Sequence, residues 1–185
     1  MLARQIVLDL ADRFEQRAQR TDLRLGVGER SGDRRGRPAQ VAERGEPLVC
    51  DIGFVRSGYH TDKTQVYFAG SRRQMPAAAA AAHEFCIEVQ SWVAAQLRPG
   101  SVPSQLAEHC FAWAERAGWA EGFMALGGNK VRFIGHGIGL AIDEYPVIAK
   151  GFDAPLEEGM LLAVEPKIGI PGLGSVWSFF VVLIV

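Results

Sequence analysis

The chain has 185 residues, of which 48% are hydrophobic and 22% are charged. This length and composition suit one globular domain with a sizeable core. A formal net charge of −1 at pH 7 argues against nucleic acid or an anionic membrane as a general partner. The three cysteines, Cys50, Cys86 and Cys110, form no paired motif, so we expect a reducing compartment and no disulfide framework.

The two ends of the chain show no export or membrane signal. Charged residues interrupt the N-terminal segment, and the apolar run 179–185 is far shorter than the roughly 20 residues that span a bilayer. Residues 3–20 have helical spacing, and the Arg/Gly-rich stretch 21–46 indicates a flexible loop rather than a nucleic-acid arm, because acids dilute its charge. The sequence predicts a soluble cytoplasmic protein with an N-terminal segment, 1–46, and a domain, 47–185.

A β-hairpin is predicted at the start of that domain. Two apolar, β-branched segments, 48–54 and 66–68, flank a stretch of turn composition. If the loop is centred just after Arg56, Asp51 lies directly opposite Asp62. Like charges at that separation destabilise a strand pair, so the carboxylates would need a shared proton or a cation between them. Alternatively, the loop has another length and both acids are solvated strand residues.

Two helices are predicted next, at 77–97 and 103–117. In the first helix, apolar side chains recur at every fourth position from Phe85 onward. The buried stripe of the second helix is expected to be Leu106, Cys110, Trp113 and Ala117. We interpret His83 and His109, which lie on these helices, as surface or hydrogen-bonded residues, because no acid or second histidine shares their face.

A glycine-rich segment around His136 follows a short predicted strand, 130–134. Glycines at alternate positions let backbone approach closely on either side of this histidine. Such a histidine suits a metal ligand or a general acid/base, although a structural role is the commoner case. A dinucleotide-binding loop is the competing interpretation, but the spacing is not GxGxxG.

The last predicted elements bring one more acid into position. A strand at 161–164 delivers Glu165, and residues 170–174 form a hairpin loop centred on Gly172. This hairpin register places Phe179 opposite Glu165.

Taken in order, Asp51, Asp62, His136 and Glu165 resemble the metal ligands of the pita-bread metallopeptidases. This family includes Xaa-Pro aminopeptidases, prolidases and methionine aminopeptidases, and the ligand spacing is most similar to the Xaa-Pro branch. The His136 setting, GHGIG, and the Glu165-Pro166 pair strengthen the resemblance. It implies an α+β fold, in which a curved, mainly antiparallel sheet holds the ligands on its inner face and helices pack outside.

The resemblance also implies roles for these residues. Asp51 would hold one metal ion, Asp62 would bridge two, and His136 with Glu165 would hold the other. Two divalent ions, of manganese, cobalt, zinc or iron, would activate water to cleave a peptide at its free N-terminus, and Glu165 would also act as general base. Two further residues, His60 and Thr64, share the strand face of Asp62 and are candidates to hydrogen-bond the ligands.

Departures from the family pattern leave the function open. The family's bridging glutamate belongs at Phe179, and no acid follows Glu165, so we expect weak or single-metal binding. At Asp143 many members carry a substrate-contacting histidine, which makes this acid a candidate catalytic residue. The chain also looks incomplete at both ends. The alternatives are an active Xaa-Pro peptidase, a non-catalytic peptide- or protein-binding member, and a truncated product without function; a homodimer is compatible with any of them.

Overall fold

The structure is a computed structural model that describes residues 47–68, 70–178 and 180–185. The predicted helix at 3–20, the segment 21–46 and Phe179 lie outside the described residues. In chain order, the elements are β1 (Pro47–Arg56), β2 (Tyr59–Phe68), the short 3-10 helix η1 (Arg72–Gln74), α2 (Ala77–Gln96), α3 (Pro103–Arg116), the 3-10 helix η2 (Gly127–Asn129), β3 (Phe133–Gly137), β4 (Glu144–Ala149), β5 (Leu161–Val164), β6 (Lys167–Ile170), β7 (Gly174–Trp177) and β8 (Phe180–Leu183).

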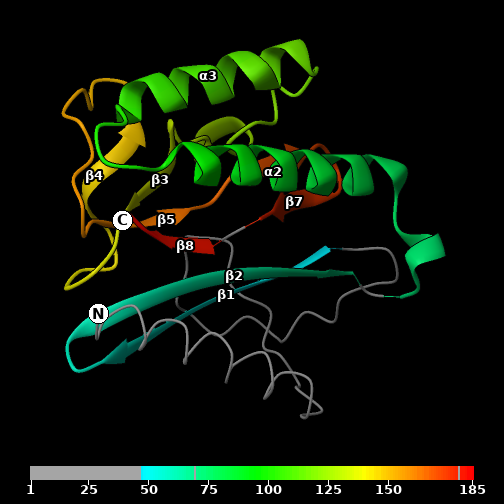
Figure 1. The fold of residues 1–185 in the computed structure, drawn as a ribbon. Helices are drawn as coiled ribbons and strands as arrows, with labels where there is room; N and C mark the ends of the chain where they lie inside the picture. Colours follow the sequence, from blue (N-terminus) through cyan, green and yellow to red (C-terminus); the bar gives the residue numbers. More distant parts are fainter. Residues whose placement is uncertain (1–46, 69, 179) are drawn as a thin grey trace.

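All described strand pairs are antiparallel, and they divide into three sheets. The central sheet has the order β4-β3-β5-β8, whereas β1 pairs with β2 and β6 pairs with β7. Helices α2 and α3 lie on one side of the central sheet, and the β1–β2 hairpin lies on the other (Figure 1). The α+β prediction is confirmed, with the expected curved sheet present as three hydrogen-bonded parts.

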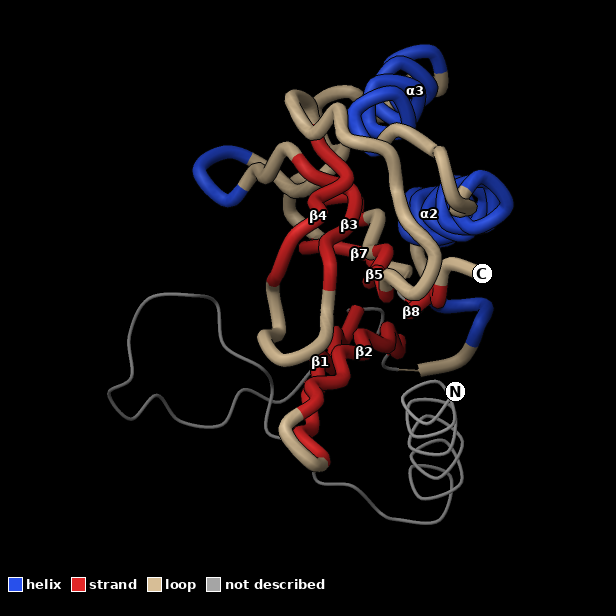
Figure 2. Tube along the Cα trace, turned by 60° about the vertical axis from the view of Figure 1, so that its left-hand side comes forward, coloured by secondary structure: helices blue, strands red, loops and turns tan. Residues whose placement is uncertain are grey.

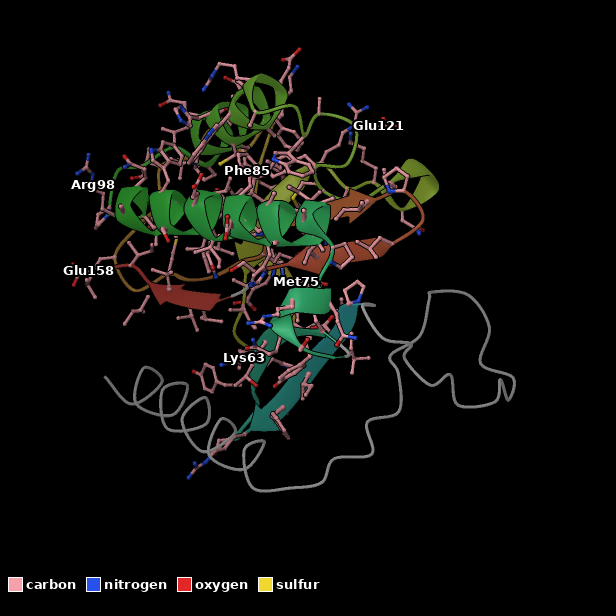
Figure 3. The ribbon with its side chains drawn as sticks, turned by 90° about the vertical axis from the view of Figure 1, so that its right-hand side faces the viewer. Lys63, Met75, Phe85, Arg98, Glu121 and Glu158 are labelled. Atoms are coloured by element: carbon pink, nitrogen blue, oxygen red, sulfur yellow. The ribbon has the colours of Figure 1, made fainter. Side chains whose placement is uncertain are left out.

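The core forms where α2 packs against the sheets. The predicted apolar face of this helix is buried at Phe85, Val89, Val93 and Leu97, none of which is more than 8% exposed. Phe85 lies between the two helices, whereas Lys63 marks the hairpin on the far side (Figure 3). The Phe85 ring meets the Trp113 ring edge to face at 5.5 Å between centroids, a favoured aromatic geometry. Burial of this face therefore fixes α2 on the sheet.

The predicted stripe of α3 needs one correction. Leu106 and Cys110 are buried and Trp113 is half-buried, but Ala117 is exposed and the buried face continues at Ala114. The helix has ended by Ala117, because Gly118 follows in the left-handed region with φ 81°, as is usual just after a helix C-terminus. The helical period therefore no longer governs which way Ala117 faces.

The predicted register of the first hairpin is wrong by two residues. Asp51 pairs with Thr64, and Asp62 pairs with Gly53. The turn is centred on Ser57 and Gly58, both with positive φ, of 52° and 84°, and such two-residue turns match the twist of hairpin strands. Because side chains alternate with a period of two, this shift keeps both acids on one face but makes them diagonal neighbours rather than opposed ones.

The second predicted hairpin has the expected register. Ile170 pairs with Gly174 across a three-residue loop that includes Gly172, where φ is 76°. The same register continues where β5 pairs with β8, since Val164 pairs with Phe180. The described pairs on both sides of Glu165 thus agree with the register from which position 179 was assigned.

Strand β3 lies three residues later than the predicted strand, 130–134, and therefore contains His136 rather than ending before it. Gly135 packs against the backbone of Ala163 on β5, and Gly137 packs against the backbone carbonyls of Glu144 and Tyr145 on β4. A Cβ atom has no space at either position. The prediction of close backbone approach beside His136 is confirmed, and the approaching chains are β4 and β5.

We expect Gly135→Ala to lower the free energy of unfolding by about 1–3 kcal/mol or more, because the added Cβ would overlap backbone that cannot move without breaking the sheet. Gly128→Ala is the matched control, since nothing lies within 4 Å of a Cβ at that glycine. Urea denaturation of both variants measures the difference. Equal stability of the two variants would contradict the packing described for β3.

Candidate metal centre

His136 lies at the centre of the candidate site and is only 4% exposed. Its strand pairs with β4 on one side and β5 on the other, and the β3–β4 register shifts on both sides of His136. Such irregularities redirect side chains and are common beside functional sites. His136 was predicted to follow a strand, but the structure places it within a central strand and buries it.

The β1–β2 hairpin supplies the aspartates of the site. The backbone N–H of His60 on β2 donates to the carbonyl oxygen of Gly139, at 2.7 Å. Gly139 belongs to the loop between β3 and β4, which reaches toward the hairpin (Figure 2). This contact joins two segments far apart in the sequence and brings Asp62 close to His136.

Three carboxylates surround the Nε2 atom of His136. The distance from Nε2 is 3.2 Å to Asp143 Oδ1, 3.9 Å to Asp62 Oδ2 and 3.9 Å to Glu165 Oε1. The other ring nitrogen, Nδ1, lies 2.9 Å from the carbonyl oxygen of Gly137. A carbonyl can only accept a hydrogen bond, so Nδ1 donates in this contact, and Nε2 is the ring nitrogen that faces the carboxylates.

Asp51 joins this group through its neighbours on the hairpin. Thr64 is buried, and its Oγ1 donates to Asp51 Oδ1 at 2.8 Å. The predicted role of Thr64 as a hydrogen-bond partner is thus found, with Asp51 as the acceptor. The other candidate partner, His60, has a buried Nδ1 atom with no hydrogen-bond partner among the described residues.

Repulsion among the acids is visible in the ionisation of Asp62. Burial is the largest cause that raises the pKa of Asp62 to about 7, followed by the negative charges of Asp51 and Glu165 and by a hydrogen bond with Asp51. The nearby imidazole of His136 opposes this shift. Desolvation and like charge both disfavour the ionised form of Asp62, and together they outweigh the effect of His136.

Sequence reasoning missed one residue of the site, Lys167. Its Nζ atom lies 3.3 Å from Glu165 Oε2, and both side chains are buried. Burial raises the pKa of Glu165, whereas the positive charge of Lys167 and then that of His136 lower it. The sequence did contain a signal for this pair: Lys167 is two residues after Glu165, and residues two apart in an extended chain share a face.

The donors at this site fit a divalent metal ion. Two atoms that coordinate one ion, each at about 2.1 Å from it, lie roughly 3–4 Å apart, and the three distances from His136 Nε2 fall in that range. Carboxylate oxygen with imidazole nitrogen suits manganese, cobalt, zinc or iron. No three such side chains are already arranged as an ion site within the described part of the chain, so binding would require small side-chain movements.

Two histidines and two cysteines lie on the helices, away from this site: His83, His109, Cys86 and Cys110. His109 stacks on Trp92 at 4.0 Å between ring centroids, and His83 lies on α2. Cys86 and Cys110 are buried free thiols, and burial raises the pKa of each to about 12. A thiol with such a pKa is a poor nucleophile at neutral pH, so these two cysteines do not offer a competing active site.

Comparison with known proteins identifies the family. The model of metallopeptidase family M24 matches residues 5–184. The chain belongs to metallopeptidase family M24. An Xaa-Pro dipeptidase from Pyrococcus furiosus is 31% identical over 151 residues, which make up 79% of this chain and 40% of that relative.

Solved structures of M24 proteins share its fold. The prolidase from Pyrococcus furiosus superimposes with a TM-score of 0.70 at 29% identity, covering 80% of this chain and 41% of that one. The X-Pro aminopeptidase from Thermotoga maritima gives a TM-score of 0.70 at 26% identity, covering 80% and 39%. The M24 chain described here therefore has the pita-bread fold that its sequence predicted.

The chain spans about 40% of the length of the curated relatives it matches.

Among the residues that the structure describes, no helix has both the length and the apolar character needed to cross a membrane.

We expect the free energy of unfolding of the metal-free chain to fall as the pH rises from about 4 to about 7. Unfolded Asp62 loses its proton near pH 3.8, whereas folded Asp62 keeps it to about 7. Between these values the folded state binds more protons, so raising the pH favours the unfolded state.

Urea denaturation of chelator-treated protein at a series of pH values measures this trend. Asp62→Asn should reduce the fall, because it removes the group that must ionise, and Glu158→Gln, at an exposed turn position, should leave it unchanged. An Asp62→Asn variant with the same pH dependence as the unaltered chain would contradict the assigned ionisation.

Proposed function

We propose that this M24 chain binds a divalent metal ion between Asp62, His136 and Glu165 and acts on the N-terminal end of short Xaa-Pro peptides. The observation that supports this most strongly is the position of His136 Nε2, which faces three carboxylates. All of these groups are hydrogen-bond acceptors when the ring is neutral and the acids are ionised. A proton or a metal ion must therefore lie among them.

Each residue of the proposed site has a distinct role. Asp62, His136 and Glu165 would hold the ion, and Asp51, oriented by Thr64, would add a carboxylate from the hairpin. A bound ion would supply Lewis-acid polarisation of the scissile carbonyl and lower the pKa of water at the site. Burial raises the pKa of Glu165, and a more basic carboxylate is a better proton acceptor, as the role of general base requires.

Asp143 is proposed to contact the substrate rather than to hold the ion. Its side chain is 74% exposed although its Oδ1 lies 3.2 Å from His136 Nε2. An exposed carboxylate at the edge of a buried site can accept hydrogen bonds from the ammonium group or an amide of an entering peptide. Asp143→Asn should therefore weaken peptide binding more than metal binding.

The proposed substrate class rests on the relatives. An Xaa-Pro dipeptidase and a prolidase from Pyrococcus furiosus are similar to this chain, and these names describe proteins that act on peptides containing proline. We extend the substrate class to this chain as a proposal, and on the sequence alone we propose a cytoplasmic location and a homodimer. Manganese and cobalt are the first ions to test, because the donors are oxygen and nitrogen.

Peptide binding without cleavage is the second candidate function. It is favoured by one observation from the sequence, the absence of any acidic residue after Glu165. In the family resemblance, a bridging glutamate belongs at Phe179, and its loss removes a ligand and a negative charge. A site short of one carboxylate can retain a peptide cleft while losing turnover.

A dipeptide assay separates the two candidate functions. The full chain, loaded with manganese, cobalt or zinc, is given an Xaa-Pro dipeptide and the matched Xaa-Ala dipeptide, and both hydrolysis and binding are measured. Metal-dependent release of proline supports the peptidase. Binding of the Xaa-Pro dipeptide without release supports the second function, and no binding of either dipeptide contradicts both.

We expect His136→Ala to weaken binding of manganese or cobalt by at least about tenfold, because it removes the nitrogen donor at the centre of the site. Isothermal titration calorimetry measures the affinity directly, without reliance on activity. His109→Ala is the matched control, since His109 stacks on Trp92 and lies on α3. If both variants bind metal as tightly as the unaltered chain, the proposed ligand set is wrong.

A further inference from the structure

Lys167 is a buried cation inside the proposed metal centre. The residue is 7% exposed and begins β6. Its Nζ atom lies 3.3 Å from Glu165 Oε2 and 5.8 Å from the centre of the Phe133 ring. A buried ammonium group is costly unless negative charge and hydrogen bonds compensate it, so the carboxylates of the site stabilise this lysine.

The carboxylate of Glu165 is shared between two sides of the site. Oε1 faces His136 Nε2 at 3.9 Å, whereas Oε2 faces the Lys167 ammonium group at 3.3 Å. One oxygen is thus directed to the place proposed for the metal ion, and the other is already paired with a positive charge. A second ion on the Oε2 side would have to approach this ammonium group against direct repulsion.

The sum of the charges at the site also argues against a second metal ion. Asp51, Asp62 and Glu165 contribute three negative charges when ionised, and Lys167 cancels one of them. The remainder equals the charge of one divalent ion, whereas two divalent ions would leave an excess of positive charge in a largely buried place. Asp143 adds little to this balance, because its exposed side chain is screened by solvent.

We propose that the Lys167 ammonium group is the resident cation on one side of this centre, where it positions Glu165 and limits the site to a single divalent ion. The inference rests on the proposed metal centre and concerns how many ions that centre holds. Lys167 is a positioning residue in this account. Its charge, rather than its packing, is the property that matters.

The test measures metal binding by the full chain rather than activity. Isothermal titration with manganese and with cobalt, supported by elemental analysis after dialysis, is applied to the unaltered chain, Lys167→Met and Lys167→Arg. We expect the unaltered chain and Lys167→Arg to bind one ion. Lys167→Met should bind a second ion, or bind the first at least about tenfold more tightly, because it removes a positive charge beside the site.

Lys130→Met is the matched control for the loss of a lysine. Its ammonium group donates to the backbone carbonyls of Ala120 and Glu121 and lies at an exposed position. This variant should bind metal like the unaltered chain. Lys167→Met with unchanged stoichiometry and affinity, in a variant that unfolds cooperatively, would overturn the proposal.

Failure of this inference and failure of the proposed metal centre give different results. If the unaltered chain and all variants bind no ion, the metal centre itself is wrong. If the unaltered chain binds two ions, the centre stands and the limit set by Lys167 is wrong. Should Lys167→Met fail to fold, the paramagnetic resonance spectrum of the manganese-saturated unaltered chain decides, because a spin-coupled ion pair would overturn the single-ion site.

Discussion

A group of carboxylates gathered around a largely buried histidine is the constraint on which this site depends. The contact of Nδ1 with the carbonyl oxygen of Gly137 leaves Nε2 of His136 facing the carboxylates. Burial and like charge disfavour ionised acids in such a place, and positive charge favours them. Burial, followed by the charges of Asp51 and Glu165, raises the pKa of Asp62. The function proposed for the chain follows from this need for positive charge.

The fold stabilises this unfavourable group through the apolar core that packs beside it. Helices α2 and α3 bury their apolar faces on one side of the central sheet, whereas the hairpin with its aspartates lies on the other side (Figure 1). Glycines beside His136 allow β4 and β5 to approach closely, which holds the histidine in a central strand. The core therefore provides the stability that the site by itself lacks.

Membership of family M24 indicates the class of site in this chain, whereas the local charges concern its capacity for metal ions. The family match and the pita-bread fold establish which class of site is present. Lys167 and the absence of acids after Glu165 are features of this chain's own sequence, and the proposed limit of one ion depends on them. A single buried lysine changes the charge balance of a buried site, so the family match alone does not give the number of ions.

The sequence by itself determined the two helices, the two hairpins and the family of the chain. Apolar spacing marked α2, the turn composition marked the first hairpin, and the order Asp51, Asp62, His136, Glu165 marked the family. These features were predictable because they depend on local periodicity or on motifs that remain recognisable whatever the rest of the chain does. The register of the second hairpin was also predictable, because it depends on the short loop centred on Gly172.

Only the tertiary structure decided how the site residues meet. Sequence reasoning opposed Asp51 to Asp62 directly, but the turn at Ser57 and Gly58 moved the register by two residues. Asp51 and Asp62 still lie on one face of the hairpin, because side chains alternate along a strand with a period of two. Contact between the hairpin and the loop after β3, and the burial of Lys167 against Glu165, join segments whose approach no local pattern specifies. Long-range packing sets those distances, and the charge balance of the site depends on them.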